Sequence, residues 1–545
     1  MSVIINSVLV LICMFQLVSS AIMNGPVPMS PNQYELKRAE FLKNEQENSV
    51  GGTLELSEDE VKANATLMGL KKQELEEGFK DPARFPPARS FLESVNDVRN
   101  SAVFGLLKKM PKGAVLHGHD TALVSIDFVI KNITYRPNLY AKLRQDTTGS
   151  NQILEELKFF PKQPDDGLWK SVAQIRQTEG ILETDDWLKM QLTLGHQDVG
   201  LDVNAVWTRF GGIFGKITPM LTYEPVWTDY FYQSLKEFHE DNINYIEFRG
   251  TLPNVYRLDG TELKEKEVCQ LYVDTLNKFK NQHPTFFGAR FIYAPHRLVN
   301  NQQFLEYARI ARDLKNAFPD FVAGFDLVGQ EDLGETLHSF STELEEMQSE
   351  MNFYFHAGET DWNGFSTDNN LVDAVLLGTK RIGHGYALLK HPQVARTVKN
   401  NQIGIEVCPI SNQVLGLVSD LRNHPGSYLL TNNYPVVIAP DDPGFWGAQG
   451  ASYDWYEAFM GLAAKWQDLR LLKQLAINSI NYSSLEGQKK QELMRDWEKR
   501  WEKFVDDVNN GSFNMRIDYE LNLEINLHAS VSGASGEVRK QLKLK

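Results

Sequence analysis

The chain contains 545 residues, of which 42% are hydrophobic, so it is long enough to bury a large core and to form two or three folded parts. The formal net charge is −15, and no block of Lys and Arg occurs before the last few residues. Nucleic acid is therefore excluded as an expected partner, because phosphate backbones are bound through clustered basic side chains.

Residues 1–20 are interpreted as a secretory signal peptide. An apolar stretch from Val8 to Val18 is followed by Ser19 and Ser20, although the start of the segment lacks Lys or Arg. A membrane anchor needs about twenty apolar residues, more than this stretch contains, and no later stretch is longer. We therefore expect a secreted, extracellular protein without a membrane span.

Glycosylation sequons and cysteines are consistent with export. Four N-x-S/T sequons, at Asn64, Asn132, Asn481 and Asn510, suggest a glycoprotein. After removal of the signal peptide the chain keeps two cysteines, Cys269 and Cys408, which we expect to be buried thiols rather than a disulfide framework.

Residues 21–110 are predicted to form a helical arm. Ser57 and Glu60 form a capping box, and the segment SFLESVNDVRNSAVFGLLKKM has apolar residues at three- and four-residue spacing. The proline-bearing segment DPARFPPARS between them must interrupt any helix. The pattern leaves two interpretations open: an arm that packs on the main domain or on a second subunit, or additional core helices.

Residues 111–510 are predicted to form an α/β domain, a (β/α)8 TIM barrel. Short β-rich runs alternate with helical patterns such as NQQFLEYARIARDLKNAF, as this fold requires. The eight runs are AVLHGH, INYIEFRG, FGARFIYAP, FVAGFDLVG, MNFYFHAGE, KRIGHG, IGIEVCPIS and PVVIAPDD. The first connection is too long for one crossover, so residues 126–200, approximately, are predicted to be an insertion after the first strand. The tail, residues 511–545, is at most a hairpin with a loose end, and we assign it no role.

Candidate metal ligands and proton carriers fall at the C-terminal ends of these runs. In MPKGAVLHGHD, His117 and His119 project from the same face of a strand, and His356, His384 and Asp441 end later runs. Active sites of TIM barrels lie at that end of the strands. Each residue also has a structural interpretation taken singly, as a core imidazole or turn residue, but their shared position favours a site.

Other polar residues next to these runs have ordinary structural explanations. Glu359 could cap a helix, and the sequence Asp441–Asp442 before a proline could serve a turn. His391 and His424, both next to proline in polar loops, are interpreted as structural.

The quoted motifs resemble a known family. MPKGAVLHGHD, HAGETDWNG, RIGHGYAL, EVCPISNQVLGLVSDLRNHP and IAPDDPGFWG are similar to signatures of the metal-dependent adenosine deaminases, most of all the secreted adenosine deaminase-related growth factor group. The resemblance implies an enzyme that hydrolyses adenosine, and 2′-deoxyadenosine, to inosine and ammonia. It implies one Zn²⁺ per subunit, bound by His117, His119, His356 and Asp441 with water completing the site.

The resemblance also assigns roles in catalysis. His384 would take the proton of the water and stabilise the attacking hydroxide, and Glu359 would protonate the purine N1. Glu359 can do so only if it stays protonated, which requires a dry pocket. The resemblance implies substrate contacts from a further set of residues: Asp120, Trp207, Phe210, Phe214, His296, Gly329 and Asp442.

The resemblance implies further partners as well. The arm would form most of a homodimer interface, and the insertion would contact a cell-surface receptor or a glycan. In some relatives a disulfide pins the insertion, but this chain has no cysteine between Cys13 and Cys269. By the same resemblance, the protein would lower extracellular adenosine and act as a growth factor.

Other classes of protein fit the sequence less well. Cytidine-type deaminases require P-C-x-x-C, and here Pro409 follows a solitary Cys408. A binuclear cyclic amidohydrolase would place a lysine where FVAGFDLVG stands, and an AMP deaminase would need a phosphate clamp that we do not see. The remaining alternative is a catalytically weak secreted growth factor or receptor-binding protein whose barrel is inert.

Overall fold

The computed structural model describes residues 29–145 and 152–512, in two compact units that divide after Asn48. The predicted signal peptide, residues 1–20, lies outside the described residues, as does the tail from residue 513 onward. The first unit contains one described helix, α2 (Pro31–Glu47), which begins at a capping box formed by Ser30 and Gln33. The other described elements belong to the second unit.

Eight parallel strands form two four-stranded sheets. Their hydrogen-bonded orders are β1-β5-β8-β9 and β10-β11-β12-β13, and every neighbouring pair is parallel. The strands are β1 (Gly113–Val115), β5 (Ile243–Gly250), β8 (Gly288–Tyr293), β9 (Val322–Phe325), β10 (His356–Ala357), β11 (Arg381–His384), β12 (Gly404–Val407) and β13 (Val436–Ile438). They coincide with the eight predicted runs, although MNFYFHAGE contributes only two residues as regular strand.

Isolated bridges join the two sheets at both edges. Phe325 at the end of β9 pairs with Phe353 just before β10, and Gly118 after β1 pairs with Asp441 after β13. The His119 N–H also donates to the Asp441 carbonyl. The eight strands therefore close into a barrel, and the α/β fold class predicted from the sequence is confirmed.

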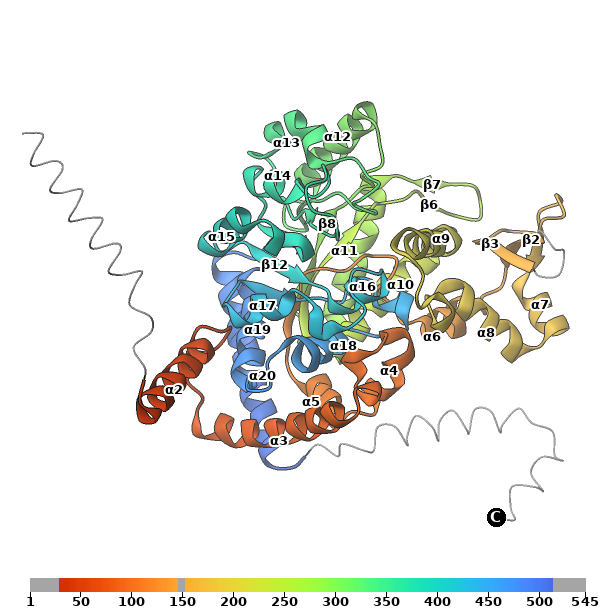
Figure 1. Ribbon diagram of the computed structural model, residues 1–545. Helices are drawn as coiled ribbons and strands as arrows, with labels where there is room; N and C mark the ends of the chain where they lie inside the picture. Colours follow the sequence, from red (N-terminus) through yellow and green to blue (C-terminus); the bar gives the residue numbers. More distant parts are fainter. Residues whose placement is uncertain (1–28, 146–151, 513–545) are drawn as a thin grey trace, which may run out of the picture. The chain divides into compact units, whose positions relative to one another are not determined.

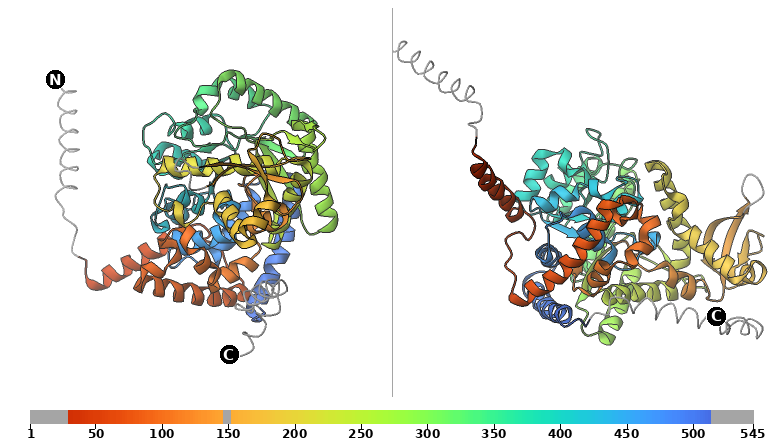
Figure 2. Two further views of the ribbon diagram at one scale, coloured as in Figure 1. Left: turned by 90° about the vertical axis from the view of Figure 1, so that its right-hand side faces the viewer. Right: turned by 60° about the horizontal axis from the view of Figure 1, so that its bottom comes forward.

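Helices follow the barrel strands and lie around them (Figures 1 and 2). Those that connect successive barrel strands are α11 (Glu265–Gln282), α12 (Asn301–Ala317), α13 (Ser341–Met347), α14 (Asn370–Leu376), α15 (Pro392–Asn400), α16 (Pro409–Val414) and α17 (Gly426–Thr431). α10 (Glu224–Glu240) precedes β5, and α18 (Ser452–Glu457) and α19 (Leu469–Asn481) follow β13.

Helix α12 illustrates why these segments are helical. Asn300 caps its first turn in a capping box with Gln303. Its buried residues Phe304, Ala308, Ala311 and Leu314 recur at three- and four-residue spacing and so form one apolar face toward the barrel.

The N-terminal part of the second unit is helical, as the periodicity predicts. α3 (Glu58–Lys80) begins at the predicted Ser57–Glu60 capping box, and two 3-10 turns, Pro82–Arg84 and Pro86–Ala88, occupy the proline-bearing segment. α4 (Phe91–Arg99) and α5 (Ala102–Lys109) follow as two helices, because Ser101 accepts the Phe104 N–H and starts a new one.

Helix α3 is tied to the C-terminal helix α20 (Gly487–Asn509). The Glu60 carboxylate accepts hydrogen bonds from Trp501 Nε1 and Lys473 Nζ, both at 2.6 Å. The Lys71 ammonium is fully buried and donates to the carbonyls of Ala464 and Gln467. Within the second unit these helices therefore belong to the packed body that surrounds the barrel.

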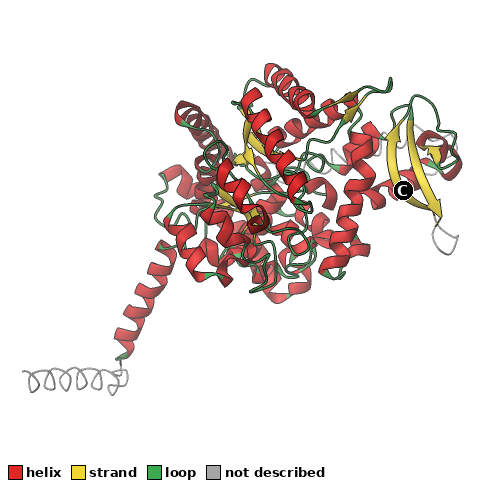
Figure 3. Cartoon of the chain, turned by 90° about the horizontal axis from the view of Figure 1, so that it is seen from above, coloured by secondary structure: helices red, strands yellow, loops and turns green. Residues whose placement is uncertain are grey.

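Between β1 and β5 the chain builds a small separate sheet. β2 (Leu139–Gln145), β3 (Gln152–Phe159) and β4 (Trp169–Ser171) pair antiparallel in the order β3-β2-β4, and Figure 3 shows them to one side of the parallel strands. α7 (Val172–Glu179) and α8 (Ile181–Leu192) follow the sheet, and α9 (Val203–Leu221) then returns the chain to the barrel. A short pair, β6 (Val255–Tyr256) and β7 (Glu262–Leu263), follows β5.

One apolar core joins the barrel to the helices around it. Cys269 and Cys408 are buried and free, as expected. Among the helices that the structure describes, none combines the length and the apolar character needed to cross a membrane.

Candidate active site

The candidate ligands converge at the C-terminal ends of the barrel strands. His117 and His119 follow β1, His356 begins β10 and Asp441 follows β13. One nitrogen or oxygen from each of these four side chains lies within 4.8 Å of one from every other. His117 Nε2 is 3.1 Å and His119 Nε2 is 3.0 Å from Asp441 Oδ1. The four residues thus form one cluster, as their sequence positions predict.

The hydrogen bonds of this cluster leave bare nitrogens facing a carboxylate. His117 Nδ1 lies 2.8 Å from Glu406 Oε2, and His356 Nδ1 lies 2.6 Å from Asp326 Oδ2. Because carboxylates accept, each Nδ1 carries a proton, and in the neutral ring Nε2 then has a lone pair. His117 Nε2 and Asp441 Oδ1 are accordingly buried without a hydrogen-bond partner, although they are in contact.

A cation resolves this arrangement. Two lone pairs that face one another across 3.1 Å repel unless a positive charge lies between them. Without a metal that charge is a proton: the Asp441 carboxylate raises the His117 pKa against the opposing effects of burial and Arg249, and His117 in turn holds the Asp441 pKa well below its usual range. A divalent cation that displaces the proton meets the same ionised carboxylate. Imidazole nitrogens and a carboxylate are the donor set that suits Zn²⁺, and the residues present therefore fit such an ion.

A second possible group of ligands shares two of these residues. His117 and Asp441 also lie near His384 and Cys408. Burial, with the nearby acidic side chains, raises the pKa of the Cys408 thiol well above its usual range. A protonated thiol is a poor ligand, which favours the cluster with His119 and His356.

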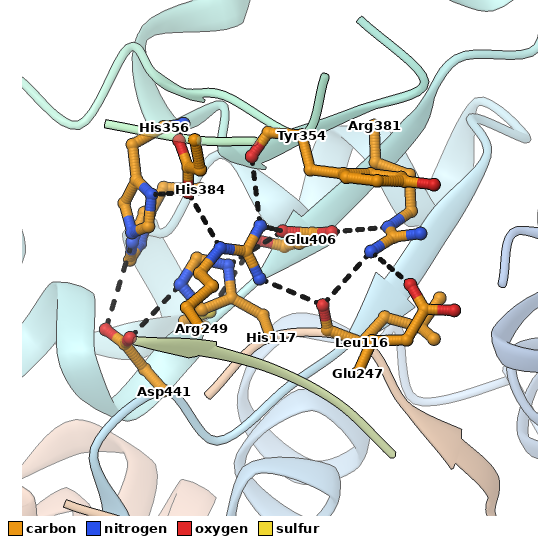
Figure 4. A network of polar contacts seen from close by, with 12 residues as sticks. Leu116, His117, Glu247, Arg249, Tyr354, His356, Arg381, His384, Glu406 and Asp441 are labelled. Carbon is orange, nitrogen blue, oxygen red and sulfur yellow. Dashed lines mark hydrogen bonds and ion pairs between the residues drawn. The ribbon is translucent and has the colours of Figure 1, made fainter. Parts of the chain in front are cut away.

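A buried charge network supports the ligands from inside the barrel (Figure 4). Arg249 Nη2 donates to Glu406 Oε2 at 2.6 Å, and its Nε donates to Asp326 Oδ2 at 2.8 Å. Arg381 pairs with both Glu406 and Glu247. All five side chains are fully buried. The network therefore orients His117 and His356 through their Nδ1 partners.

Sequence analysis did not identify these five residues. Each one is a charge inside an otherwise apolar run: Glu247 and Arg249 in INYIEFRG, Asp326 in FVAGFDLVG, Arg381 in KRIGHG, and Glu406 in IGIEVCPIS. A charged residue that interrupts a buried strand is a detectable signal, because buried charges are rare unless they are paired.

Glu359 lies beside the cluster in a loop that is held by a second glutamate. Glu331 accepts the backbone N–H groups of Gly358 and Glu359, at 3.0 and 2.6 Å, and also binds Asn370 Nδ2. Burial, together with the Asp441 and Glu331 carboxyls, raises the pKa of Glu359 well above its usual range. The environment of the side chain therefore favours its protonated form.

His384 faces the same space from the end of β11. Its Nε2 lies 3.6 Å from Glu359 Oε1 and 3.8 Å from Asp441 Oδ2. His384 and Asp441 both have positive φ, at 62° and 59°, a conformation that non-glycine residues seldom adopt. Such strain concentrates at functional sites, because only a surrounding structure that fixes the residue sustains it.

A cavity of about 630 Å³ opens onto these groups. It is lined by all seven residues predicted to contact substrate: Asp120, Trp207, Phe210, Phe214, His296, Gly329 and Asp442. The candidate ligands and proton carriers that also line it are His119, His356, Glu359, His384 and Asp441. His117 is not among the lining residues, since it is fully buried beneath them. The structure therefore brings all the predicted site residues together.

The aromatic residues of α9 form one wall of the cavity. Phe210 contacts both Trp207 and Phe214 edge to face, and Phe214 packs on Phe445 at 4.7 Å between ring centroids. They serve core packing and cavity lining at once, so the two interpretations of these residues are compatible.

Asp120 and Gly329 show how tightly the backbone approaches the cavity. A Cβ at Gly250 would lie 2.0 Å from Asp120 Oδ2, so glycine is required there. Tyr272 donates to the same oxygen at 2.7 Å, but burial raises the Asp120 pKa to about 7. Gly329 has φ +106°, which disfavours any other residue.

Comparisons with known proteins agree with the site. The sequence model of the family described as Adenosine deaminase matches residues 200–499, and that described as Adenosine/AMP deaminase N-terminal matches residues 10–107. A protein named adenosine deaminase from Lutzomyia longipalpis is 49% identical over 485 residues, covering 88% of this chain and 95% of its own length. The chain belongs to the adenosine deaminase family.

Further members of the adenosine deaminase family agree over a similar span. A protein named adenosine deaminase 2 from Homo sapiens is 42% identical over 482 residues, covering 86% of this chain and 93% of its own. Membership confirms the predicted resemblance and the predicted enzyme class, a hydrolase of the adenosine deaminase type.

Solved structures agree on the fold. An amidohydrolase from Burkhoderia ambifaria, solved with bound Zn, has a TM-score of 0.52 and 17% identity, covering 75% of this chain and 95% of its own. An N6-mAMP deaminase from Arabidopsis has a TM-score of 0.52 and 16% identity, covering 72% of this chain and 99% of its own.

Proposed function

We propose that this protein is a secreted, zinc-dependent enzyme that converts adenosine, and 2′-deoxyadenosine, to inosine and ammonia. The observation that carries the proposal is the contact between His117 Nε2 and the Asp441 carboxylate, two buried groups without another partner, beside a buried Glu359 whose raised pKa favours the protonated carboxyl. The names of the relatives, adenosine deaminase and adenosine deaminase 2, support the choice of substrate.

One zinc ion per subunit would be held by His117, His119, His356 and Asp441. When bound, zinc lowers the pKa of a coordinated water to about 7 and so supplies a nucleophile at neutral pH. The Nδ1 partners Glu406 and Asp326 keep the His117 and His356 rings in the tautomer that presents Nε2.

Glu359 is the acid of the proposed reaction. Because its carboxyl is protonated, it can deliver a proton to N1 of the purine while the oxygen of water adds to C6. One proton of the water restores the Glu359 carboxyl and the other passes to the exocyclic amine. The C6–N bond then breaks, ammonia leaves, and the oxygen of water becomes the C6 carbonyl oxygen of inosine.

The remaining cavity residues would bind and orient the nucleoside. Asp442 lies next to the ligand Asp441, and burial together with Asp441 raises its pKa well above the usual range, so it can donate to a ring nitrogen. Gly329 would offer its backbone N–H, and Asp120 and His296 would lie near the ribose. The aromatic residues Trp207, Phe210 and Phe214 exclude water from one side.

The proposal extends to the setting of the enzyme. Residues 1–20 would direct export, with sequons at exposed Asn132, Asn481 and Asn510 open to glycosylation. Residues 21–110 would mediate a homodimer, and the segment 126–200 would contact a receptor or glycan. Removal of extracellular adenosine would underlie a growth-factor effect.

Conversion of adenosine to inosine by the purified protein, followed by ultraviolet absorbance, tests the proposal. AMP and guanosine serve as comparison substrates, and Glu359→Gln is the matched variant, because it keeps the shape of the side chain but removes its acidic proton. We expect selective conversion of adenosine that disappears in the variant while bound zinc is retained. A folded, zinc-loaded protein without activity would favour the alternative of a secreted ligand.

A further inference from the structure

Behind the His384 ring, two buried side chains form a continuous chain of hydrogen bonds. Asn412 Nδ2 lies 3.1 Å from His384 Nδ1, and Asn412 Oδ1 lies 3.0 Å from His424 Nε2. The chain ends on the backbone, where the Gly426 N–H lies 2.8 Å from His424 Nδ1. His384 and His424 are each 2% exposed and Asn412 is fully buried, so these groups depend on one another for hydrogen bonds.

The backbone end of the chain fixes the direction of every bond in it. A backbone N–H can only donate, so His424 Nδ1 accepts and the proton of the neutral ring lies on Nε2. Burial lowers the His424 pKa to about 3, which keeps that ring neutral. His424 Nε2–H must therefore donate to Asn412, and the atom that receives it must be the amide oxygen.

Asn412 then determines which ring nitrogen of His384 carries the proton. With its oxygen toward His424, Asn412 presents its NH2 group to His384 Nδ1, and an NH2 group can only donate. The opposite amide orientation would set two donors against each other at His424. Amide orientation is often ambiguous, but here the Gly426 N–H decides it.

We propose that Asn412 and His424 are positioning residues that fix His384 with its proton on Nε2. That nitrogen faces the candidate site, 3.6 Å from Glu359 Oε1 and 3.8 Å from Asp441 Oδ2. In this state His384 donates a hydrogen bond to the oxygen that adds to C6 and does not remove a proton from it. This role differs from that of a base, which the family resemblance implies.

The inference rests on the proposed deamination, and it leaves the proton balance to Glu359. The Glu359 carboxyl, protonated at the start, gives its proton to N1 of the purine, and the resulting carboxylate takes one proton from the attacking water. The second proton of the water leaves on the amine as ammonia, and the oxygen remains on C6. Glu359 is therefore neutral before it delivers its proton and neutral again after the water has added.

Asn412→Asp distinguishes the two possible roles of His384, hydrogen-bond donor and base, because kcat should fall in the first case and should not fall in the second. A carboxylate accepts from both rings, so it would move the His384 proton to Nδ1 and leave Nε2 bare. We expect kcat to fall by about tenfold to hundredfold with little change in KM, the effect of losing one hydrogen bond to a charged oxygen. An unchanged or higher kcat would overturn the proposal, because a base would be strengthened.

Two further variants control for charge and for packing. Asn423→Asp adds the same charge at an exposed position, in the 3-10 turn Leu421–Asn423 that precedes His424, and should leave kcat unchanged. His424→Gln keeps an N–H donor toward Asn412 and should retain most activity, whereas His424→Leu leaves the amide free to reverse and should lose it. Equal loss in both His424 variants would indicate a packing role and contradict the proposal.

Nitrogen NMR of histidine-labelled wild-type protein tests the proton position without any turnover. We expect His384, assigned by its absence in His384→Gln, to show an unprotonated Nδ1 and a protonated Nε2. A protonated Nδ1 would refute the proposal. If the wild type does not deaminate adenosine, the proposed function fails, while the NMR result still decides the tautomer.

Discussion

The buried network beneath the ligands can be tested by Glu406→Gln, which keeps the size of the side chain and removes its charge. Glu406 Oε2 accepts from His117 Nδ1 and Arg249 Nη2, and Oε1 accepts from Arg381 Nε. An amide has one oxygen and one NH2 group, so either orientation places a donor against at least one of these donors. Arg249 keeps Asp326 and Arg381 keeps Glu247, so neither guanidinium loses every partner.

These contacts set the expected magnitude. Breaking a buried ion pair by removing one partner costs about 3–5 kcal/mol, and the retained carboxylates place Glu406→Gln near the lower end, about 3 kcal/mol. That loss is a large fraction of the roughly 5–15 kcal/mol by which proteins of this kind are stable. His117 also loses its anionic partner, so zinc affinity should fall by about tenfold to hundredfold.

Two measurements check the prediction for Glu406→Gln. Denaturant unfolding of metal-stripped protein, followed by tryptophan fluorescence, reports stability, and a chelator competition reports zinc affinity. Glu346→Gln, at an exposed position, is the matched control and should change neither quantity. A loss below about 1 kcal/mol with normal zinc affinity would show that the network neither stabilises the barrel nor orients His117.

The ligand cluster, the N-terminal helices and the cavity wall can each be perturbed at single contacts. Asp441→Ala should lower zinc content in elemental analysis, because it removes the only ionised carboxylate of the proposed ligand set; unchanged zinc would remove Asp441 from that set. Deletion of residues 1–48 should leave the melting temperature of the second unit unchanged. Deletion of all residues before Ser90 also removes the Glu60 and Lys71 contacts and should give monomers or misfolded protein by light scattering. Intact dimers after the longer deletion would place the interface elsewhere. The Asp120 pKa is about 7, against a usual 3.8, so this carboxyl ionises at lower pH in the unfolded chain than in the folded protein. The free energy of unfolding should therefore fall as pH rises from about 4 to 7. Asp120→Asn should reduce the slope of unfolding free energy against pH in this range, and an unaltered slope would refute the pKa shift.

The sequence predicts the barrel because eight runs each carry a local signal of burial. Runs such as FGARFIYAP and PVVIAPDD are apolar enough to be strands, and the helical patterns between them set the parallel order. The exact strand lengths are not predictable in the same way. MNFYFHAGE forms only two residues of regular strand at His356–Ala357, because pairing with neighbours, rather than composition, determines where a strand begins and ends.

The sequence likewise predicts some of the site residues and not others. His117, His119, His356 and Asp441 are detectable because each ends a run, and barrel topology brings run ends together. The hydrogen-bond partners that fix their tautomers are not detectable as partners, since Glu406 lies 289 positions from His117. The polar, proline-bearing surroundings of His424 predict a structural role, whereas the structure links His424 to His384 through Asn412.

The polar atoms without partners explain why the site is built of paired charges. His117 Nε2, Asp441 Oδ1 and Asp442 Oδ1 are buried without hydrogen bonds, and each such atom costs about 1–3 kcal/mol until a ligand binds it. A barrel can hold these atoms in place only if the surrounding charges are themselves satisfied, as Arg249 and Arg381 are through their carboxylate partners. The paired charges of Arg249 and Arg381 therefore stabilise the centre of the barrel, and this stability holds the unpaired polar atoms in position to bind a cation and a substrate.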